Sequence, residues 1–542
     1  MRVYMAFAAL MLVVETTQSM PCAPQEFTDG IVCVCNDTYC DTLEDVEPTG
    51  ENDFVAVSSS KSGMRFAVSK GEFTKVAPIS LDYDRNEPIV ILRPKRSFWD
   101  SIIGIFESKN ATIKVDRSIT YQEIVGFGGA LTGSASWNLD QLTPALQNHV
   151  YRSFYSKDKG IAYNMLRLTI GGSDFDFEPW AYNEFPENDA SLSNFTKLDP
   201  RDARKVEQIK QLMEISNNKN IKFYGTAWSP PKWMKTNNAW TGPSALKLEY
   251  YQTWADYHLK WLELMDQAGL NMWGISTGNE PINGVIGFLI IKFLSLGWIP
   301  QTQAKWLAEN FGPTLRNSKY KNILIMGPED QRIVLPNWLD IMESTVKGST
   351  SYLDGISLHW YWDFFIPASF LDKSHDQFEG KIIINTESSA GSFPLQRHMP
   401  ILGDWGRAEQ YLNDFMSDFQ HHLNGWIDWN LILDEQGGPN YVQNFVDAPI
   451  IRANDSTLIY KQPLFYAIGH FSRFMQPGSV RVEASSSERN VKTAAFKQPD
   501  GSIALVVHNR EYTTVNLEVE DSVRGTIKLS LPGKSIHTII YK

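Results

Sequence analysis

The 542-residue sequence is poor in cysteine, in positive charge and in metal- or nucleotide-binding motifs. Its 50 lysines and arginines are outnumbered by 62 aspartates and glutamates, so the net charge of −12 argues against nucleic acid as a partner. No His-Glu-x-x-His motif occurs among the ten scattered histidines, and the glycines between positions 126 and 133 do not fit the dinucleotide-binding pattern. We therefore expect no cofactor and no metal.

The composition is that of a globular protein with many aromatic residues. Hydrophobic residues make up 43% and charged residues 21%, which excludes a disordered or collagenous chain. The length exceeds the usual limit of one core, so a large and a smaller domain are expected. The 17 Trp, 21 Tyr and 29 Phe exceed what packing requires, although most must lie in the core. The surplus suits stacking on sugar rings or lining an apolar cleft.

The amino terminus, residues 1–20, has the composition of a secretory signal peptide. Arg2 supplies a positive charge and positions 5–14 are mostly apolar, a run too short to span a bilayer. The only four cysteines follow directly, and an even, crowded set in a secreted chain predicts disulfides within residues 21–50. A zinc site is the alternative, but a one-residue spacer is too short for it and no histidine is near. The cysteines are Cys22, Cys33, Cys35 and Cys40.

Four glycosylation sequons agree with passage through the secretory pathway. They begin at Asn36, Asn110, Asn194 and Asn454.

Both ends of the chain have the alternating pattern of antiparallel strands. Apolar and polar residues alternate around 54–57, 64–68 and 111–115, and again at 493–496, 503–507, 515–519 and 537–540. We expect residues 51–120 and 479–542 to build one β-sandwich domain together.

The middle of the chain, residues 121–478, alternates strands with amphipathic helices. Asp199 is the expected N-cap of one helix, and another has aromatic residues from Tyr250 to Trp261 at helical spacing. Eight such repeats predict a (β/α)₈ TIM barrel with its active site at the carboxyl ends of the strands. The expected strands are 124–129, 164–170, 222–228, 272–277, 322–326, 355–360, 381–386 and 425–433.

Two glutamates follow the fourth and seventh expected strands. Glu280 lies in Asn279-Glu280-Pro281, and Glu387 follows an apolar run. A carboxylate at the end of a buried strand is costly unless it is paired or used, although either one alone could be an ordinary salt-bridge partner. Two at matching strand ends suit glycoside hydrolysis, which needs one carboxyl group to protonate the leaving oxygen and another to act at the anomeric carbon.

Other strand ends carry residue types that bind carbohydrate, namely Asp174, Trp228 and the runs 359–361 and 426–430. The alternative for each tryptophan is a lid on the barrel core.

At this point the sequence resembles the glucosylceramidases (acid β-glucosidases) of glycoside hydrolase family 30, nearly from end to end. Any single motif is weak, but eight in order are specific. They are the cysteine cluster and the runs 126–130, 173–175, 228–231, 279–281, 359–361, 425–430 and 437–440.

The resemblance implies a retaining β-glucosidase that cleaves glucosylceramide by double displacement, with Glu387 as nucleophile and Glu280 as acid/base. It also implies the disulfides Cys22–Cys33 and Cys35–Cys40, a lysosomal or secreted location, an anionic membrane surface and a saposin-type activator. Arg167, His359 and Tyr361 would orient the glutamates. The glucose hydroxyls would be held by Asp174, Trp228, Asn279, Trp429 and Asn440.

Two features depart from the family pattern. Gly278 stands where the family usually has a second glutamate. The stretch 285–300 is apolar, with Lys292 its one charge, and does not match the family's loop. It is either a buried cap or a membrane contact at the rim of the active site, and we favour the rim contact because it starts five residues after Glu280.

Two alternatives stay open. The same fold hosts many specificities, so the substrate could be another β-glucoside, a β-xyloside or a β-1,6-glucan. A non-catalytic glycolipid-binding protein is the other, although the presence of both Glu280 and Glu387 argues against it.

Overall fold

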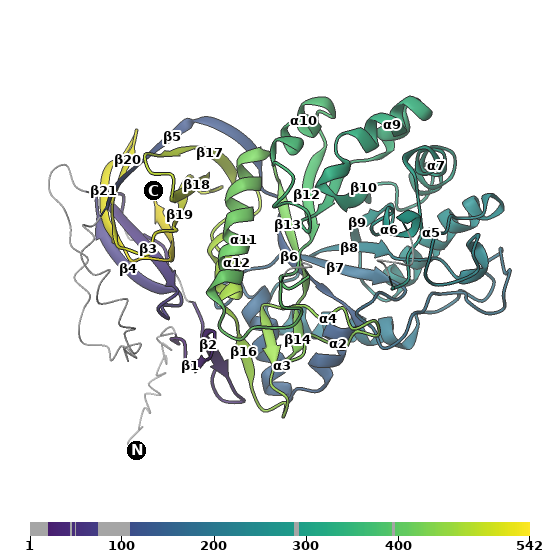
Figure 1. The fold of residues 1–542 in the computed structure, drawn as a ribbon, viewed down its shortest axis with the longest axis horizontal. Helices are drawn as coiled ribbons and strands as arrows, with labels where there is room; N and C mark the ends of the chain where they lie inside the picture. Colours follow the sequence, from purple (N-terminus) through teal and green to yellow (C-terminus); the bar gives the residue numbers. More distant parts are fainter. Residues whose placement is uncertain (1–19, 44–45, 49, 74–108, 287–291, 393–395) are drawn as a thin grey trace, which may run out of the picture.

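The computed structural model describes residues 20–43, 46–48, 50–73, 109–286, 292–392 and 396–542. Eight parallel strands close into a barrel in the order β10-β11-β12-β13-β6-β7-β8-β9, which occupies the right-hand part of Figure 1 with helices around it. The predicted TIM barrel is therefore confirmed. The strands are β6 (Gly126–Leu131), β7 (Met165–Ile170), β8 (Lys222–Ala227), β9 (Met272–Ser276), β10 (Leu324–Gln331), β11 (Gly355–His359), β12 (Ile382–Glu387) and β13 (Gly425–Asn430).

Six barrel strands lie within two residues of their predicted bounds, and two differ by more. β10 runs to Gln331, five residues beyond the predicted end at Met326, and a bulge between Pro328 and Asp330 interrupts its pairing with β11. The predicted eighth strand divides at Leu431 into β13 and a separate strand, β14 (Ile432–Asp434). Gly327, Pro328 and the polar residues after them hid the extension of β10, and the apolar residues 431–433 hid the break after β13.

The helices follow the sequence rules for their ends. As predicted, Asp199 caps α4 by accepting a hydrogen bond from the Arg201 N–H, and Pro200 occupies the first helical position. In α5 the predicted apolar face, including Trp254 and Trp261, is buried. The larger helices are α2 (Gly133–Asp140), α3 (Pro144–Tyr155), α4 (Pro200–Ile215), α5 (Tyr251–Gln267), α9 (Asn337–Thr345), α10 (Ser369–Gln377), α11 (Trp405–Asp418) and α12 (Pro463–Ser472); shorter ones are α6 (Asn283–Ile286), α7 (Pro300–Trp306) and α8 (Gly312–Arg316).

Strands from both ends of the chain form one nine-stranded sheet in the order β21-β20-β5-β17-β18-β19-β22-β3-β4. Side chains from both ends share its core, for example Phe54, Ile113, Leu505 and Leu529. All its pairs are antiparallel except β5 with β20, which is parallel. The strands are β3 (Asp53–Ser60), β4 (Ala67–Glu72), β5 (Lys109–Glu123), β17 (Val480–Ser486), β18 (Val491–Lys497), β19 (Ile503–Asn509), β20 (Val515–Asp521), β21 (Gly525–Leu531) and β22 (Ser535–Tyr541).

The amino-terminal segment forms a small sheet with residues that follow β13. Its order is β1-β2-β16-β15-β14, and the turned view places β1 (Pro24–Phe27) and β2 (Gly30–Cys35) below the nine-stranded sheet. β15 and β16 span Ile450–Arg452 and Ile459–Lys461. The disulfides Cys22–Cys33 and Cys35–Cys40 are present, as expected, so the zinc alternative is wrong.

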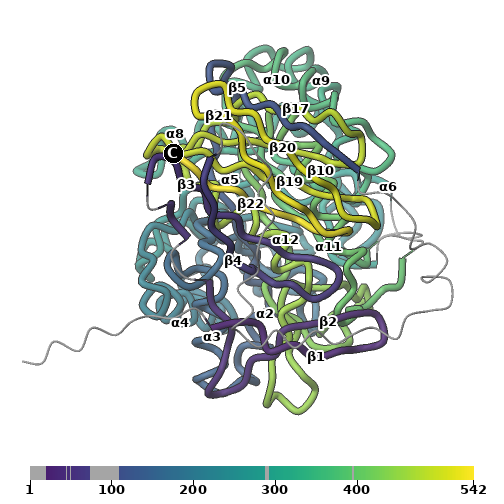
Figure 2. Tube along the Cα trace, turned by 90° about the vertical axis from the view of Figure 1, so that its left-hand side faces the viewer, coloured from purple at the N-terminus to yellow at the C-terminus, as the bar shows by residue number. Residues whose placement is uncertain are grey.

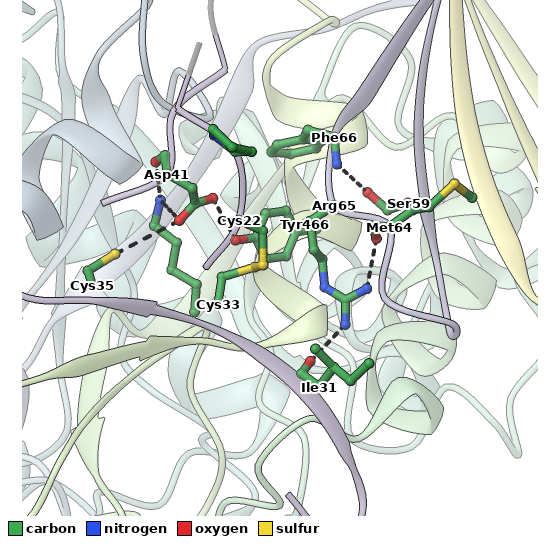
Figure 3. The surroundings of a disulfide bond; sticks show 12 residues. Cys22, Ile31, Cys33, Cys35, Asp41, Ser59, Met64, Arg65, Phe66 and Tyr466 are labelled. Carbon is green, nitrogen blue, oxygen red and sulfur yellow. Dashed lines mark hydrogen bonds and ion pairs between the residues drawn. A yellow bond between two sulfur atoms is a disulfide. The ribbon is translucent and has the colours of Figure 1, made fainter. Parts of the chain in front are cut away.

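Buried polar groups attach this segment to the rest of the chain (Figure 3). The Arg65 guanidinium donates to the Ile31 carbonyl at 2.7 Å. Asp41 accepts from the Tyr466 hydroxyl at 2.7 Å and pairs with Lys461 at 3.0 Å. The first two of these contacts link the segment to β3–β4 and to α12, so the disulfide-bonded unit is part of the main fold.

Two helices join the barrel to the nine-stranded sheet. α11 and α12 pack on each other, α12 also contacts β3 and β22, and α11 contacts β18. Figure 1 shows both helices between the two sheets. All ten residues of α12 are buried, as expected for a helix covered on every side.

Apolar side chains fill the barrel interior near the amino ends of the strands. Met165, Tyr224, Met326, Ile384 and Ile427 form one apolar cluster from five strands. Side chains alternate along a strand, so the next inward residue of β7 after Met165 is Arg167, one layer nearer the carboxyl ends. Polar chemistry therefore begins directly above an apolar plug. None of the helices in the described part of the chain is long and apolar enough to cross a membrane.

Candidate active site

The barrel brings the two predicted glutamates together. Glu280 follows β9 and Glu387 ends β12, and the carboxyl ends of parallel strands meet at one edge. A carboxyl oxygen of Glu280 lies within 4.8 Å of one of Glu387, and the residues are only 8% and 6% exposed. This close approach agrees with the carboxyl spacing of about 5–5.5 Å that is typical of retaining glycosidases.

The two carboxylates have different partners. Glu387 accepts hydrogen bonds from the guanidinium of Arg167 and, at 2.8 Å, from the Tyr361 hydroxyl. Glu280 accepts from the amide groups of Asn283 and of Gln331, the latter at 2.8 Å. The guanidinium of Arg167 therefore contacts Glu387 directly, whereas side-chain amides contact Glu280.

His359 lies between the two glutamates. Its Nδ1 is 2.8 Å from Glu280 Oε1 and 4.0 Å from Glu387 Oε1, and the ring is fully buried. Burial alone would lower the pKa of His359, but Glu387 and Glu280 outweigh it and raise that pKa to about 10. The ring is therefore a cation at the pH values at which proteins work.

A third carboxylate, Glu329, lies beneath these groups and was missed by the sequence analysis. It falls in the β10 bulge, is fully buried, and its Oε1 is 2.9 Å from Arg167 Nη2. Its backbone φ of +64° is strained for any residue but glycine, and Glu280 has a similar φ of +42°. The available indication was a Glu-Asp pair just beyond an apolar run, as at the other strand ends.

The residues predicted to hold a sugar lie on the same edge of the barrel. Trp228 and Trp429 stack with ring centroids 5.3 Å apart, and the Arg167 guanidinium carbon lies 4.9 Å and 5.1 Å from their centroids. Asp174 accepts from the Asn440 amide at 3.2 Å. Burial, with Glu387 nearby, raises the pKa of Asp174 to about 7.

Trp360 and Trp426, from the runs 359–361 and 426–430, do not lie with the residues predicted to hold a sugar. Trp360 packs on Tyr411 of α11 and on Trp426, and Trp426 is completely buried between the barrel and α11, where it packs on Phe415. For these two the prediction of a carbohydrate contact is wrong, because the side chains alternate and theirs face the surrounding helices.

Gly278, the departure from the family pattern, has a φ of +122°, and a Cβ there would lie 4.0 Å from Trp298 Nε1. A glutamate could adopt this backbone only with strain.

The apolar stretch 285–300 is only partly explained by the rim hypothesis. Val285, Ile286 and Ile299 are exposed, but Leu294, Leu296 and Trp298 are buried in the core. The favoured rim contact is therefore wrong for these three residues, which pack as a cap. Residues 287–291 lie outside the described part of the chain.

The described residues contain three groups with metal-ligand side chains at short spacing, but each is otherwise engaged. A protonated His359 has no lone pair to offer beside Glu280 and Glu387. Cys35 and Cys40 form a disulfide. Three aspartates, Asp363, Asp414 and Asp418, surround the guanidinium of Arg332.

The sequence matches two domain families in agreement with this geometry. Residues 124–475 match the glycosyl hydrolase family 30 TIM-barrel domain, and residues 478–539 match the family 30 beta sandwich domain. The chain belongs to glycoside hydrolase family 30. It is therefore a glycosidase.

Relatives of this family 30 chain cover nearly its whole length. It is 34% identical to the mouse lysosomal acid glucosylceramidase over 531 residues, 97% of this chain and 96% of the mouse protein. Among solved structures, SrfJ from Salmonella typhimurium matches with a TM-score of 0.76 at 22% identity, and the endo-beta1,6-glucanase BT3312 with 0.74 at 21%. Each match covers 90% of this chain and 99% of the other. These two structures support the fold alone.

Proposed function

We propose that this family 30 enzyme is a retaining β-glucosidase that hydrolyses glucosylceramide to glucose and ceramide. The observation that carries the proposal is the close pair Glu280 and Glu387, with oxygens within 4.8 Å, at the ends of two barrel strands. The similarity to the mouse lysosomal acid glucosylceramidase supports the choice of substrate.

Glu387 is the proposed nucleophile and Glu280 the proposed acid/base. Glu387 attacks the anomeric carbon while Glu280 gives its proton to the leaving oxygen of ceramide, and the bond between that oxygen and the anomeric carbon breaks. Glu280 then takes a proton from water, whose oxygen displaces Glu387 and releases glucose with its configuration retained. Arg167 and Tyr361 both donate hydrogen bonds to Glu387 and so hold its carboxyl group in position.

The sugar is held by Asp174, Trp228, Asn279, Trp429 and Asn440 in this proposal. Arg167 Nη2 donates to the Asn279 carbonyl oxygen at 2.8 Å, which fixes the amide orientation and leaves its N–H₂ group for the 2-hydroxyl of the sugar. The stacked pair Trp228 and Trp429 provides the apolar wall on which a pyranose face rests.

The lipid part of the substrate is proposed to reach the site from an anionic membrane surface, with help from a saposin-type activator. Three aromatic residues follow Tyr361 directly and are exposed: Trp362 by 50%, Phe364 by 58% and Phe365 by 65%. Exposed aromatic side chains beside a barrel mouth suit the interface between water and lipid.

We also propose that the chain enters the secretory pathway through a signal peptide at residues 1–20 and works in the lysosome or outside the cell. The four sequon asparagines, Asn36, Asn110, Asn194 and Asn454, are all exposed and so accessible to a glycosyltransferase.

The test is turnover of glucosylceramide in vesicles at acidic pH, with and without phosphatidylserine. We expect glucose release that the anionic lipid increases. Replacing Trp362 and Phe365 by serine together should reduce vesicle binding and glucosylceramide turnover but spare a small soluble β-glucoside. Tyr512→Ser, which replaces an 80% exposed aromatic in the loop between β19 and β20, is the matched control and should change neither.

Other outcomes of this assay distinguish the alternatives. Cleavage of β-xylosides or β-1,6-glucans without glucosylceramide would leave the mechanism in place and change the substrate. Glycolipid binding without turnover of any β-glycoside would contradict the enzyme.

A further inference from the structure

Glu329 is the most deeply buried carboxylate of the site and has no role in the mechanism described above. Its side chain is fully buried, and three groups surround it. Arg167 Nη2 is 2.9 Å from its Oε1, the Tyr224 hydroxyl donates to its Oε2, and His359 Nε2 lies 3.6 Å from Oε1, an ion-pair distance rather than a hydrogen bond. Arg167 and His359 are the cations that touch the two proposed catalytic glutamates.

Glu329 supplies a negative charge that the cluster beneath the catalytic pair needs. Two other buried carboxyl groups nearby, Asp174 and Asp330, have a pKa raised to about 7 by burial and by the neighbouring carboxylates, so both carry a proton at mildly acidic pH. In the state that starts the reaction, Glu280 carries a proton and Glu387 is ionised. Arg167 and His359 then supply two positive charges, whereas Glu387 alone supplies one negative charge. Ionised Glu329 provides the second, so the buried cluster becomes neutral overall, which burial requires.

The geometry points to Glu329 as a positioning residue that keeps His359 protonated and Arg167 fixed beneath the catalytic pair. Arg167 Nη2 donates to the Glu329 carboxylate and to the side-chain oxygen of Asn279, and Nη1 donates to Glu387. One carboxylate thus fixes the group that orients both the nucleophile and the amide beside the acid/base. The backbone carbonyl of Glu329 also accepts a hydrogen bond from the backbone N–H of Glu280 at 2.9 Å, so the backbone of Glu329 positions the acid/base directly.

The ionisation of these groups agrees with this role. Burial alone would raise the pKa of Glu329, but Arg167 and His359 outweigh it and bring that pKa to about 2. Glu329 is therefore charged throughout the working range and cannot serve as a second acid. It contributes in turn to the raised pKa of His359.

The inference rests on the proposed β-glucosidase function, but its direct test does not need activity. The ring ¹⁵N shifts of His359 would be followed against pH by NMR in the full-length protein labelled at histidine, with His359→Asn to assign the signal. In the native protein we expect a protonated ring well above neutral pH. In Glu329→Gln the midpoint should fall by at least about one pH unit, because a buried counter-charge is removed. An unchanged midpoint would overturn the inference, whether or not any glucoside is cleaved.

Kinetics supply the second readout. Glu329→Gln should lower kcat on an aryl β-glucoside roughly 10- to 100-fold with little change in KM, and the alkaline limb of its pH profile should move to lower pH. A lower melting temperature with kcat and pH profile unchanged would show a merely structural role. Glu409→Gln removes the same charge from a carboxylate that pairs with Lys534 at 3.2 Å and should alter neither.

A conservative variant keeps the test valid if Glu329→Gln does not fold. Glu329→Asp retains the charge but withdraws it by one methylene group, so the His359 midpoint and kcat should lie between those of the native and Gln forms. A His359 midpoint in Glu329→Asp equal to the native one would also contradict the inference.

Discussion

The central residues of the site differ in their partners, so their substitutions should differ in effect. Glu387→Gln should abolish formation of the glycosyl-enzyme for every substrate, because no other described carboxylate lies at the nucleophile position. Glu280→Gln should reduce hydrolysis of substrates with poor leaving groups by roughly 10²–10⁴-fold but largely spare glycosyl-enzyme formation from activated aryl glucosides. Burst kinetics on both substrate types measure this. Similar behaviour of the two variants on both would show that the roles are assigned wrongly.

The same pair sets the pH dependence of activity. Double displacement needs a protonated acid and an ionised nucleophile, so for the proposed lysosomal enzyme kcat/KM should be highest at mildly acidic pH and fall as pH rises. A profile on a soluble β-glucoside checks this, with circular dichroism at each pH to exclude unfolding. A maximum at or above neutral pH would contradict a lysosomal role.

Single residues could be placed from the sequence where a strand end carried a polar group. Glu280, Glu387, Asp174 and His359 were found in this way. Glu329 was missed because its strand continues through Gly327 and Pro328, which usually end one. Trp360 was wrongly predicted to contact carbohydrate. Alternate residues of a strand face the inside and the outside of the barrel, and a short apolar run does not show which residues face inward.

Among the elements, the loop that carries Tyr361 is attached to α11 by an unusual charge cluster. Arg332 contacts Asp363 of this loop and, at 2.7 Å, Asp418 of α11, and lies 3.9 Å from Asp414. Burial, together with Asp418 and Asp363, raises the pKa of Asp414. Because the folded state binds this proton more tightly than the unfolded chain, the stabilisation is complete at low pH and is lost as pH rises through the raised pKa.

Removing this excess negative charge should therefore stabilise the protein at neutral pH. We expect Asp414→Asn to raise the melting temperature at pH 7 by about 2 °C and to change it little at pH 4.5. Asp418→Asn is the matched comparison and should lower the melting temperature at both pH values, because this carboxylate accepts two hydrogen bonds from Arg332. Scanning calorimetry measures both, and a loss of stability in Asp414→Asn at pH 7 would contradict the account.

The elements themselves were largely predictable, because periods of 2 and 3.6 residues mark strands and helices. The caps of α4 followed local rules. The parallel pairing of β5 with β20 did not, since partners from opposite ends of the chain leave no local pattern.

On the scale of the whole molecule, the barrel depends on the sheet built from both chain ends. α12 is completely buried and contacts β3 and β22 as well as α11. A fragment of residues 121–478 would expose this apolar helix, so we expect it to aggregate when expressed alone. Size-exclusion chromatography with circular dichroism measures whether the fragment aggregates and whether it is folded. A soluble, monomeric, active fragment would show that the barrel folds without the nine-stranded sheet.

The central claim is that this chain cleaves β-glucosides through a covalent bond between glucose and Glu387. The most direct measurement is peptide mass spectrometry after reaction with a 2-deoxy-2-fluoro-β-glucoside carrying a good leaving group, which slows release of the glycosyl-enzyme. The account predicts one fluoroglucosyl adduct on the peptide that contains Glu387, and none in Glu387→Gln. Turnover without any adduct, or an adduct on Glu280 or Glu329, would contradict it.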